Sequence, residues 1–406
     1  MTSRPTLART LLVTATAATA LLFLSACVAN SPTTATGVSA SKATALTVES
    51  SATACTVSAA TAPSGPIAFT ITNSTDQPTE FYVLADDGLR IVGEVENIAP
   101  GAPRKLTVQL APGGYFTTCK PGMVGDGIGR AAFTVTDSGK SIELAGTEKT
   151  QAATAAANYV AYVKDQVSQL IPATSAFLDA YLAGDTARAR TLYPAARAYY
   201  ERIEPVAESF GDLDPEIDFR EADVAAGDQW TGWHRLEKDL WPPSAADNGG
   251  TTYVALTPAE RTAFAAKLTT NTRQLADAVN AKSYSVTSAA ISNGAIGLLD
   301  EVANGKITGE EEIWSHTDLW DFQANLEGAR VAYEGVRDIV KPKNPKLVTQ
   351  IDTQFAALEK QLASYGSLST GFTYYNDLTT TQVRQLADGV NALSEPLSKL
   401  TAALVK

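Results

Sequence analysis

Residues 131–170, AAFTVTDSGKSIELAGTEKTQAATAAANYVAYVKDQVSQL, contain the point at which the chain changes its structural character. The first six, AAFTVT, are strand-like and stop at Asp137-Ser138-Gly139, which predicts a strand and a turn. Beyond residue 150, helix-forming Ala, Leu, Gln, Lys and Glu dominate. Apolar side chains then recur at the spacing of one helical face: Val160, Val163, Val167 and Leu170. We therefore predict a β part followed by an α part.

Upstream of this point, short strand-like segments are separated by turn residues. Residues 67–73, 80–84 and 105–110 each read as a strand, and each ends at a cluster of Gly, Pro, Asn or Asp. Short strands at near-regular spacing are typical of a β-sandwich, which we predict over residues 48–147.

Downstream, the helical pattern persists to the C-terminus. Phe355, Leu358 and Leu362 share one helical face, and prolines such as Pro242 and Pro243 fall where helices should break. Residues 148–406 are long enough to bury a substantial core, so we predict one all-α helical bundle there.

The N-terminus carries the features of an export signal. Arg4 and Arg9 precede an apolar run over residues 11–24, which is shorter than a membrane span. Cys27 follows Leu-Ser-Ala directly, which resembles a bacterial lipobox and implies cleavage after residue 26 and lipidation of Cys27. A plain signal peptide with an incidental cysteine is the alternative. Residues 27–47, rich in Ser, Thr and Ala, read as a flexible tether.

Composition limits the possible functions. The 406 residues carry a formal net charge of −12 without a basic stripe, which argues against nucleic acid as a partner. Two histidines, His234 and His316, are the only imidazoles available for a metal site or for catalysis.

Acidic residues gather around the first histidine. Glu201, Glu204 and Glu208 would share one face of a helix, either as a solvated acidic surface or as cation ligands. An acidic stretch that includes Asp218 follows, and then His234 and Glu237 at i and i+3. One imidazole with several carboxylates suits Zn²⁺, Fe²⁺, Fe³⁺ or Cu²⁺. A histidine packed between tryptophans is the structural alternative, and the zinc-protease motif with two histidines is absent from the sequence.

The second histidine has a simpler interpretation. Ser315 and Asp318 predict an N-terminal helix cap, and His316, Asp321 and Asn325 lining one face of that helix is the functional alternative. Because capping alone explains these polar residues, we expect His316 to be structural. The acidic run Glu310-Glu311-Glu312 is expected to be solvated.

In the β part, two cysteines allow two interpretations. In the first, Cys55 and Cys119 form a disulfide, which is favoured outside the cytoplasm. In the second, they bind a metal ion together with acids such as Glu80 and Glu94.

Several longer motifs resemble the EfeO family of iron-uptake proteins. They are Tyr200-Glu-Arg-Ile-Glu-Pro205, Thr231-Gly-Trp-His-Arg-Leu-Glu-Lys238 and Ser315-His-Thr-Asp-Leu-Trp-Asp-Phe-Gln-Ala-Asn325. Residues 96–101 and 112–119 resemble the cupredoxin-like domain that precedes the imelysin-like helical domain in this family.

The resemblance implies a lipid-anchored, extracytoplasmic component of an EfeUOB-type system. Such a protein captures iron, as Fe³⁺ or Fe²⁺, and delivers it to a membrane ferric permease, with a haem-dependent peroxidase as a third component. The implied ligands are His234, Glu237, Glu201, Glu204 and Asp218, with Glu208 outside them. Cu²⁺ or Zn²⁺ would also suit these groups. An imelysin-type metallopeptidase is the alternative function, and a glycan-binding lipoprotein is a weaker one.

Overall fold

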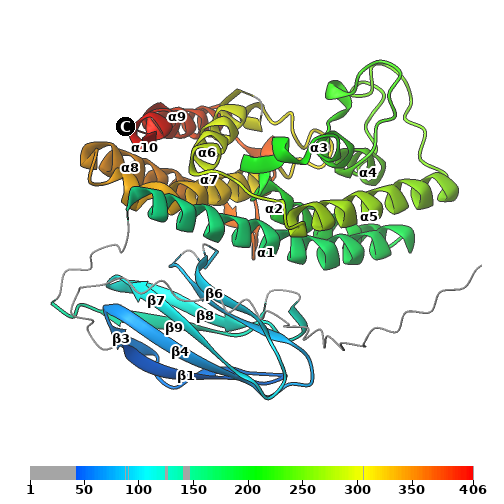
Figure 1. The fold of residues 1–406 in the computed structure, drawn as a ribbon. Helices are drawn as coiled ribbons and strands as arrows, with labels where there is room; N and C mark the ends of the chain where they lie inside the picture. The colour runs from blue at the N-terminus through cyan, green and yellow to red at the C-terminus, as the bar shows by residue number, and fades with distance from the viewer. Residues whose placement is uncertain are drawn as a thin grey trace, which may run out of the picture. The chain divides into compact units, whose positions relative to one another are not determined.

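The computed structural model describes residues 43–86, 88–89, 91–123, 127–139, 147–304 and 306–405. The predicted signal peptide, Cys27 and most of the predicted tether lie outside these residues. A β part and an α part follow one another along the chain, as predicted (Figure 1).

The β part consists of strands in two sheets. Their bounds are β1 Thr44–Ser50, β2 Cys55–Val57, β3 Thr61–Pro63, β4 Gly65–Asn73, β5 Thr79–Leu84, β6 Ile91–Ile98, β7 Pro103–Leu110, β8 Gly113–Cys119 and β9 Ile128–Thr136. One sheet has the order β2-β1-β4-β7 and the other has the order β3-β9-β8-β5-β6. Most neighbours are antiparallel, whereas β1 with β4 and β3 with β9 are parallel.

The two sheets share one hydrophobic core. Alternate residues of β4 are buried, including Phe69, whose ring centroid lies 5.3 Å from that of Phe81 and 5.7 Å from that of Phe133 in the other sheet. The period-2 pattern therefore places one face of each sheet inside, which confirms the predicted β-sandwich. The finer assignment of a cupredoxin-like fold stays a prediction.

The structure corrects one boundary of the sandwich and decides between two interpretations of its cysteines. Strand β1 begins at Thr44, so the last residues of the predicted tether, 44–47, belong to a sheet. Cys55 on β2 and Cys119 on β8 are joined by a disulfide, which resolves the choice left open by the sequence. The two sulfur atoms of the alternative metal site are therefore bonded to each other, and Glu80 accepts a hydrogen bond of 2.7 Å from the Tyr82 hydroxyl.

The α part contains helices of very different lengths. The α-helices are α1 Glu148–Leu182, α2 Thr186–Glu201, α3 Leu213–Asp218, α4 Trp233–Leu240, α5 Pro258–Asn280, α6 Ser288–Asn304, α7 Asp318–Val340, α8 Pro345–Leu362, α9 Thr380–Leu397 and α10 Leu400–Val405. Between them lie the 3₁₀ turns η2 Glu204–Phe210, η3 Glu221–Asp223, η4 Lys306–Thr308 and η5 Tyr375–Asp377, and a short hairpin of β10 Gly366–Ser367 and β11 Gly371–Phe372. Among these helices, none is long and apolar enough to cross a membrane.

The helical core confirms the predicted apolar faces. Val163, Val167 and Leu170 on α1 are buried, as are Phe355, Leu358 and Leu362 on α8. The core cluster extends through α2, α4 and α7, which supply most of the polar side chains described below.

One glycine brings two of these elements close together. Gly232, directly before α4, has a φ of +86°, and a Cβ placed there would lie 2.1 Å from the carbonyl oxygen of Ile217. Only glycine adopts this φ easily and leaves room for the Ile217 backbone at this distance. Gly232 therefore allows the start of α4 to lie against the end of α3. His234 and Asp218 are thereby brought to the same place.

Candidate metal centre

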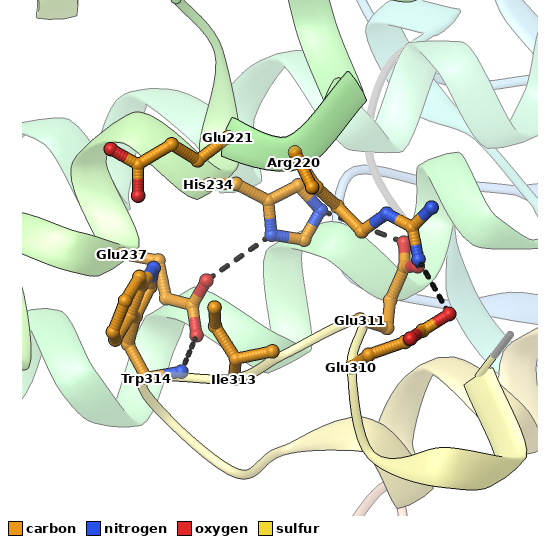
Figure 2. A pocket seen from close by; sticks show the side chains of 9 residues that line it. Arg220, Glu221, His234, Glu237, Glu310, Glu311, Ile313 and Trp314 are labelled. Atoms are coloured by element: carbon orange, nitrogen blue, oxygen red, sulfur yellow. Dashed lines mark hydrogen bonds and ion pairs between the residues drawn. The ribbon is translucent and has the colours of Figure 1, made fainter. Parts of the chain in front are cut away.

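The centre is built around the imidazole of His234 on α4. His234 and Glu237 lie on the same face of this helix and are both buried, with exposed fractions of 1% and 0%. His234 Nδ1 lies 3.2 Å from Glu237 Oε2, within hydrogen-bonding distance (Figure 2). A carboxylate on one ring nitrogen fixes the ring orientation and directs the other nitrogen toward a ligand.

The other ring nitrogen faces two carboxylates from distant parts of the chain. His234 Nε2 lies 3.7 Å from Asp218 Oδ1 and 3.5 Å from Glu311 Oε1, and the three atoms lie within 4.8 Å of one another. Two donors about 2.1 Å from a tetrahedral metal ion are roughly 3.4 Å apart. Among the described atoms, buried Nε2 has no hydrogen-bond partner that meets normal geometry. These three atoms therefore fit the coordination shell of one cation.

A second arrangement of possible ligands lies on the opposite side of the same ring. His234 Nδ1, Glu237 Oε2 and Glu312 Oε1 also lie within 4.8 Å of one another. Glu237 and Glu312 already make several other contacts. Glu237 Oε1 accepts the backbone N–H groups of Trp314 and Ser315 at 3.0 and 2.7 Å. Glu312 Oε2 accepts the Ser315 hydroxyl at 2.7 Å. These hydrogen bonds hold the loop before α7 against α4.

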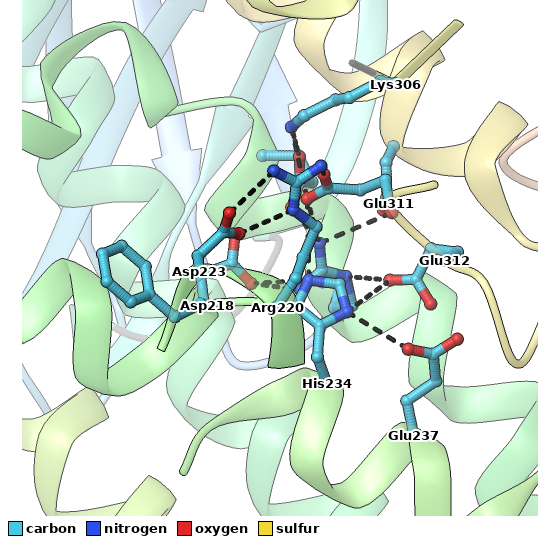
Figure 3. A network of polar contacts seen from close by, with 12 residues as sticks. Asp218, Arg220, Asp223, His234, Glu237, Lys306, Glu311 and Glu312 are labelled. Atoms are coloured by element: carbon cyan, nitrogen blue, oxygen red, sulfur yellow. Dashed lines mark hydrogen bonds and ion pairs between the residues drawn. The ribbon is translucent and has the colours of Figure 1, made fainter. Parts of the chain in front are cut away.

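Glu311 and Glu312 are the site residues that the sequence did not identify. They were expected to be solvated, but Glu311 is 6% exposed and Glu312 is fully buried. They lie in the turn between η4 and α7, and both lie close to His234 (Figure 3). Only Glu310 of the acidic run is exposed, as expected. The apolar pair Ile313-Trp314, which follows the run directly, is the one sequence feature that hints at burial.

Glu201 and Glu204 do not share a helical face as predicted. Helix α2 ends at Glu201, and Glu204 begins the 3₁₀ turn η2. Both carboxylates contact the ammonium of Lys306, Glu201 Oε2 at 2.9 Å and Glu204 Oε2 at 2.8 Å. The predicted ligands therefore surround a cation, but that cation is a side chain of the protein. The side chain of Glu208 lies outside the described part of the chain.

Arg197 connects the two groups of acids. This fully buried side chain forms ion pairs with Asp218, with Glu201 Oε1 at 2.6 Å and with Glu312 Oε1 at 2.7 Å. Its Nη2 also lies 3.5 Å from Asp321 and 3.7 Å from Glu311. Buried arginine with several carboxylates fixes their positions and offsets part of their charge.

Carboxylates outnumber cations in this buried cluster, within the described part of the chain. Arg197 and Lys306 are its cationic side chains with fixed charge. The acids of the cluster are Glu201, Glu204, Asp218, Glu237, Glu311, Glu312, Asp318 and Asp321. Burial disfavours uncompensated charge, so the surplus favours either bound protons or an additional cation.

The pKa values reflect this surplus. Burial raises the pKa of Asp218 to about 7 despite the opposing Arg197 guanidinium. Burial and repulsion by Glu237 raise the pKa of Glu312 well above its usual value. Burial also opposes ionisation of Glu311, but the positive charge of Lys306 and the adjacent His234 ring lower its pKa below the ordinary range. Burial and Arg197 lower the pKa of His234, yet the hydrogen bond to Glu237 and the nearby carboxylate of Glu311 outweigh them and raise it to about 9. A metal ion would therefore displace protons from this centre.

A pocket of about 150 Å³ reaches the centre from the surface. It is lined by Arg220, Glu221, Ala222, His234, Glu237, Glu310, Glu311, Ile313 and Trp314 (Figure 2). Glu221 and Glu310 have side chains about half exposed, at 46% and 53%, and each is paired with a cation, Glu221 with Lys238 at 2.5 Å and Glu310 with Arg220 at 3.4 Å. Arg220 lies among them and is paired with Asp223 at 2.7 Å.

His316 does not belong to this cluster, and the predicted helix cap is wrong. Helix α7 has Thr317 as its N-cap residue, and Asp318 is its first residue. Ser315 instead donates to Glu312, and Asp318 accepts the backbone N–H of Glu312 at 3.2 Å. These polar residues stabilise the loop that carries Glu311 rather than the helix end. His316 has a φ of +59°, and its carbonyl oxygen accepts the Tyr375 N–H at 2.9 Å.

Comparison with known proteins agrees with this arrangement of parts. A family model described as imelysin, of the peptidase M75 group, matches residues 155–400. The iron uptake system component EfeO of Escherichia coli (strain K12) is 37% identical over 350 residues, which cover 84% of this chain and 86% of that protein. The proteins of the same name from Shigella flexneri and Shigella sonnei (strain Ss046) match over the same lengths with the same identity. The chain therefore belongs to the EfeO family, and its helical part is an imelysin domain.

Proposed function

We propose that this protein binds iron as the metal-capturing component of an extracytoplasmic iron uptake system. The observation that carries the proposal is the convergence of His234 Nε2, Asp218 Oδ1 and Glu311 Oε1 at the end of a pocket. The relatives' names as iron uptake components supply the identity of the metal.

Asp218, His234 and Glu311 hold the ion in this proposal, and Glu237 and Glu312 support them. Glu237 is assigned this supporting role because both of its oxygens already accept or share hydrogen bonds, with His234 on one side and the loop backbone on the other. Supporting carboxylates of this kind orient a ligating imidazole and increase its basicity. Water completes the coordination shell from the pocket.

The donor set favours a hard or borderline cation. Two carboxylates and one imidazole suit Fe³⁺ and Fe²⁺, and they also accept Zn²⁺ or Cu²⁺. The surplus of buried negative charge favours the higher charge of Fe³⁺. Ferric iron is therefore the proposed cargo, and the protein releases it to a membrane permease that acts with a haem-dependent peroxidase. Anchoring through a lipid on Cys27 would keep the protein at the membrane where that transfer takes place.

A metal-binding role accounts for the centre better than peptide hydrolysis does. A metallopeptidase needs a general base beside the metal-bound water in addition to its ligands. Glu237, the acid nearest to His234, is engaged in orienting the ring and in holding the loop backbone. We therefore propose that the protein has no peptidase activity.

Calorimetric titration of the purified protein tests the proposal. Wild type should bind one Fe²⁺ under anaerobic conditions, and ferric citrate should load one Fe³⁺. The double variant Asp218→Asn with Glu311→Gln should bind neither ion, while Glu395→Gln, at an exposed position of α9, should bind as wild type does. Undiminished iron binding in the double variant would contradict the proposed ligands. Proteolysis of a peptide library that disappears on chelation would favour the peptidase instead.

A further inference from the structure

The ammonium of Lys306 occupies a buried position inside the acidic cluster. Its Nζ lies 2.9 Å from Glu201 Oε2 and 3.0 and 2.8 Å from the two oxygens of Glu204, and the side chain is 2% exposed. Asn325 Nδ2 donates to the same two carboxylates, at 3.0 Å to Glu201 and 2.6 Å to Glu204. Two carboxylates with a polar amide around one positive charge have the composition of a cation site, and Lys306 fills it.

Lys306 is also next to the proposed iron site. Its Nζ lies 3.7 Å from Glu311 Oε1, and the same oxygen lies 3.5 Å from His234 Nε2. A metal ion bound to this oxygen would share it with a permanent positive charge a few ångströms away (Figure 3). Water does not screen this repulsion well, because Lys306 and Glu311 are both buried.

Arg197 also approaches Glu311, but its contacts differ from those of Lys306. Arg197 holds Asp218, Glu201 and Glu312 in place by direct ion pairs, so it organises the whole centre. Among the described contacts of Lys306, the closest are with Glu201 and Glu204, which lie outside the proposed ligands. Lys306 therefore contributes charge at the centre without fixing Asp218 or His234.

We propose that Lys306 is an internal competing cation, which lowers the affinity of the centre for metal and speeds release. The inference rests on the proposed function and assigns a release determinant to that site. A metal ion and the ammonium compete for the negative charge of Glu311, so the centre binds less tightly than its carboxylates alone would allow. Such weakening suits a protein that must give its ion to a partner rather than store it.

The expected effect is large because the charges are close. If the metal ion and Lys306 Nζ are about 6 Å apart and the effective dielectric constant is about 20, the charge on Lys306 weakens binding roughly a hundredfold for each positive charge of the metal. Protonation of Glu201 or Glu204 after loss of Lys306 would offset part of this gain. We therefore expect Lys306→Met to bind Zn²⁺ and Fe²⁺ at least tenfold more tightly, with slower dissociation.

The test measures affinity by calorimetry with Zn²⁺ and with anaerobic Fe²⁺, and dissociation by mixing the loaded full-length protein with excess chelator in a stopped-flow instrument. Lys306→Arg keeps the charge and should remain close to wild type. Lys346→Met removes an exposed lysine of α8 and should have no effect. If Lys306→Met does not fold, the lysine is removed in a Glu204→Gln background instead. The double variant Glu204→Gln with Lys306→Met should then bind metal more tightly than Glu204→Gln alone.

Each outcome decides the proposal. Tighter binding and slower release in Lys306→Met, with Lys306→Arg unchanged, would support an internal competing cation. Unchanged or weaker binding in a folded Lys306→Met would overturn it, since Lys306 would then have no effect or would support the ligands. Wild type that binds neither ion would instead refute the proposed function, so the two failures are distinguishable.

Discussion

Replacement of Glu311 by Gln is the most informative single substitution at the proposed centre. Gln keeps the size of the side chain and removes its negative charge, in a position where Oε1 lies 3.5 Å from His234 Nε2. The adjacent Glu310 offers a matched control, because its side chain is 53% exposed at the rim of the same pocket.

The magnitude follows from the position of Glu311. Loss of a supporting carboxylate outside the coordination shell costs about 10–100-fold in metal affinity, so loss of a ligand should exceed about 100-fold, or roughly 2.7 kcal/mol. Burial opposes ionisation of Glu311, but Lys306 and His234 hold its pKa below the usual range, so the carboxylate also stabilises the metal-free fold above about pH 4. We expect a loss of about 1–2 kcal/mol in unfolding free energy, since other acids still pair with Lys306 and Arg197.

The assay combines two measurements on the same samples. Calorimetry with Zn²⁺ and anaerobic Fe²⁺ gives the affinity, and thermal unfolding with and without metal gives the stability. Glu311→Gln should lose the metal-dependent rise in melting temperature, whereas Glu310→Gln should keep it with an affinity within about threefold of wild type. Wild-type affinity in Glu311→Gln, or an equal loss in both variants, would refute the assignment of Glu311 as a ligand.

Three further predictions test other parts of the proposal. Glu237→Gln should lower metal affinity by about 10–100-fold, because Glu237 orients His234 without binding the ion. X-ray absorption of the loaded variant should show an unchanged coordination number, and a decrease by one ligand would contradict this role. Metal affinity should rise with pH through 7 and on toward 9, because burial raises the pKa of Asp218 to about 7 and neighbouring carboxylates raise the pKa of His234 to about 9, so each holds a proton that the metal displaces. Calorimetric titrations in buffers of different ionisation enthalpy should detect release of about one proton or more at pH 6.5. Metal binding without proton release would contradict this prediction. The double variant Cys55→Ser with Cys119→Ser removes a disulfide between residues 64 positions apart, so denaturant titration should show an unfolding free energy lower by about 2–5 kcal/mol. Metal affinity should be unchanged, and an altered affinity would implicate the cysteines in metal binding.

The fold could be predicted where the pattern of side chains is local. The alternation of residues 67–73 and the helical spacing around Val163 each describe one element and its buried face, and both are correct. Strands such as β2 and β3 span only three residues, too few for alternation to be recognised. Strand β3 is held by parallel pairing with β9, in which Thr61 lies opposite Thr134, and nothing near Thr61 in sequence indicates that partner.

The centre could be predicted only in the part that lies on one helix. His234 and Glu237 are three residues apart on α4, so their common orientation follows from helical geometry. Glu311 reaches the same place from a loop more than seventy residues later, and an acidic run beside solvated loops has the same appearance in sequence whether it is buried or exposed.

The prediction for Glu201 and Glu204 depended on a helix that ends too early. Continuation of α2 would have put both carboxylates on one face, but the chain turns into a 3₁₀ segment at Glu204. Their neighbour Lys306 comes from η4, about a hundred residues away in the chain, so no local pattern indicates that a lysine already balances them.

Anomalous diffraction at the iron absorption edge, from crystals loaded with ferric citrate, tests the proposed centre most directly. We predict one strong peak within about 2.0–2.3 Å of His234 Nε2, Asp218 and Glu311, with Lys306 still held by Glu201 and Glu204. A peak bonded to Glu201 and Glu204 with Lys306 displaced would contradict the proposed ligands. The absence of any peak at His234 would contradict iron capture by this centre.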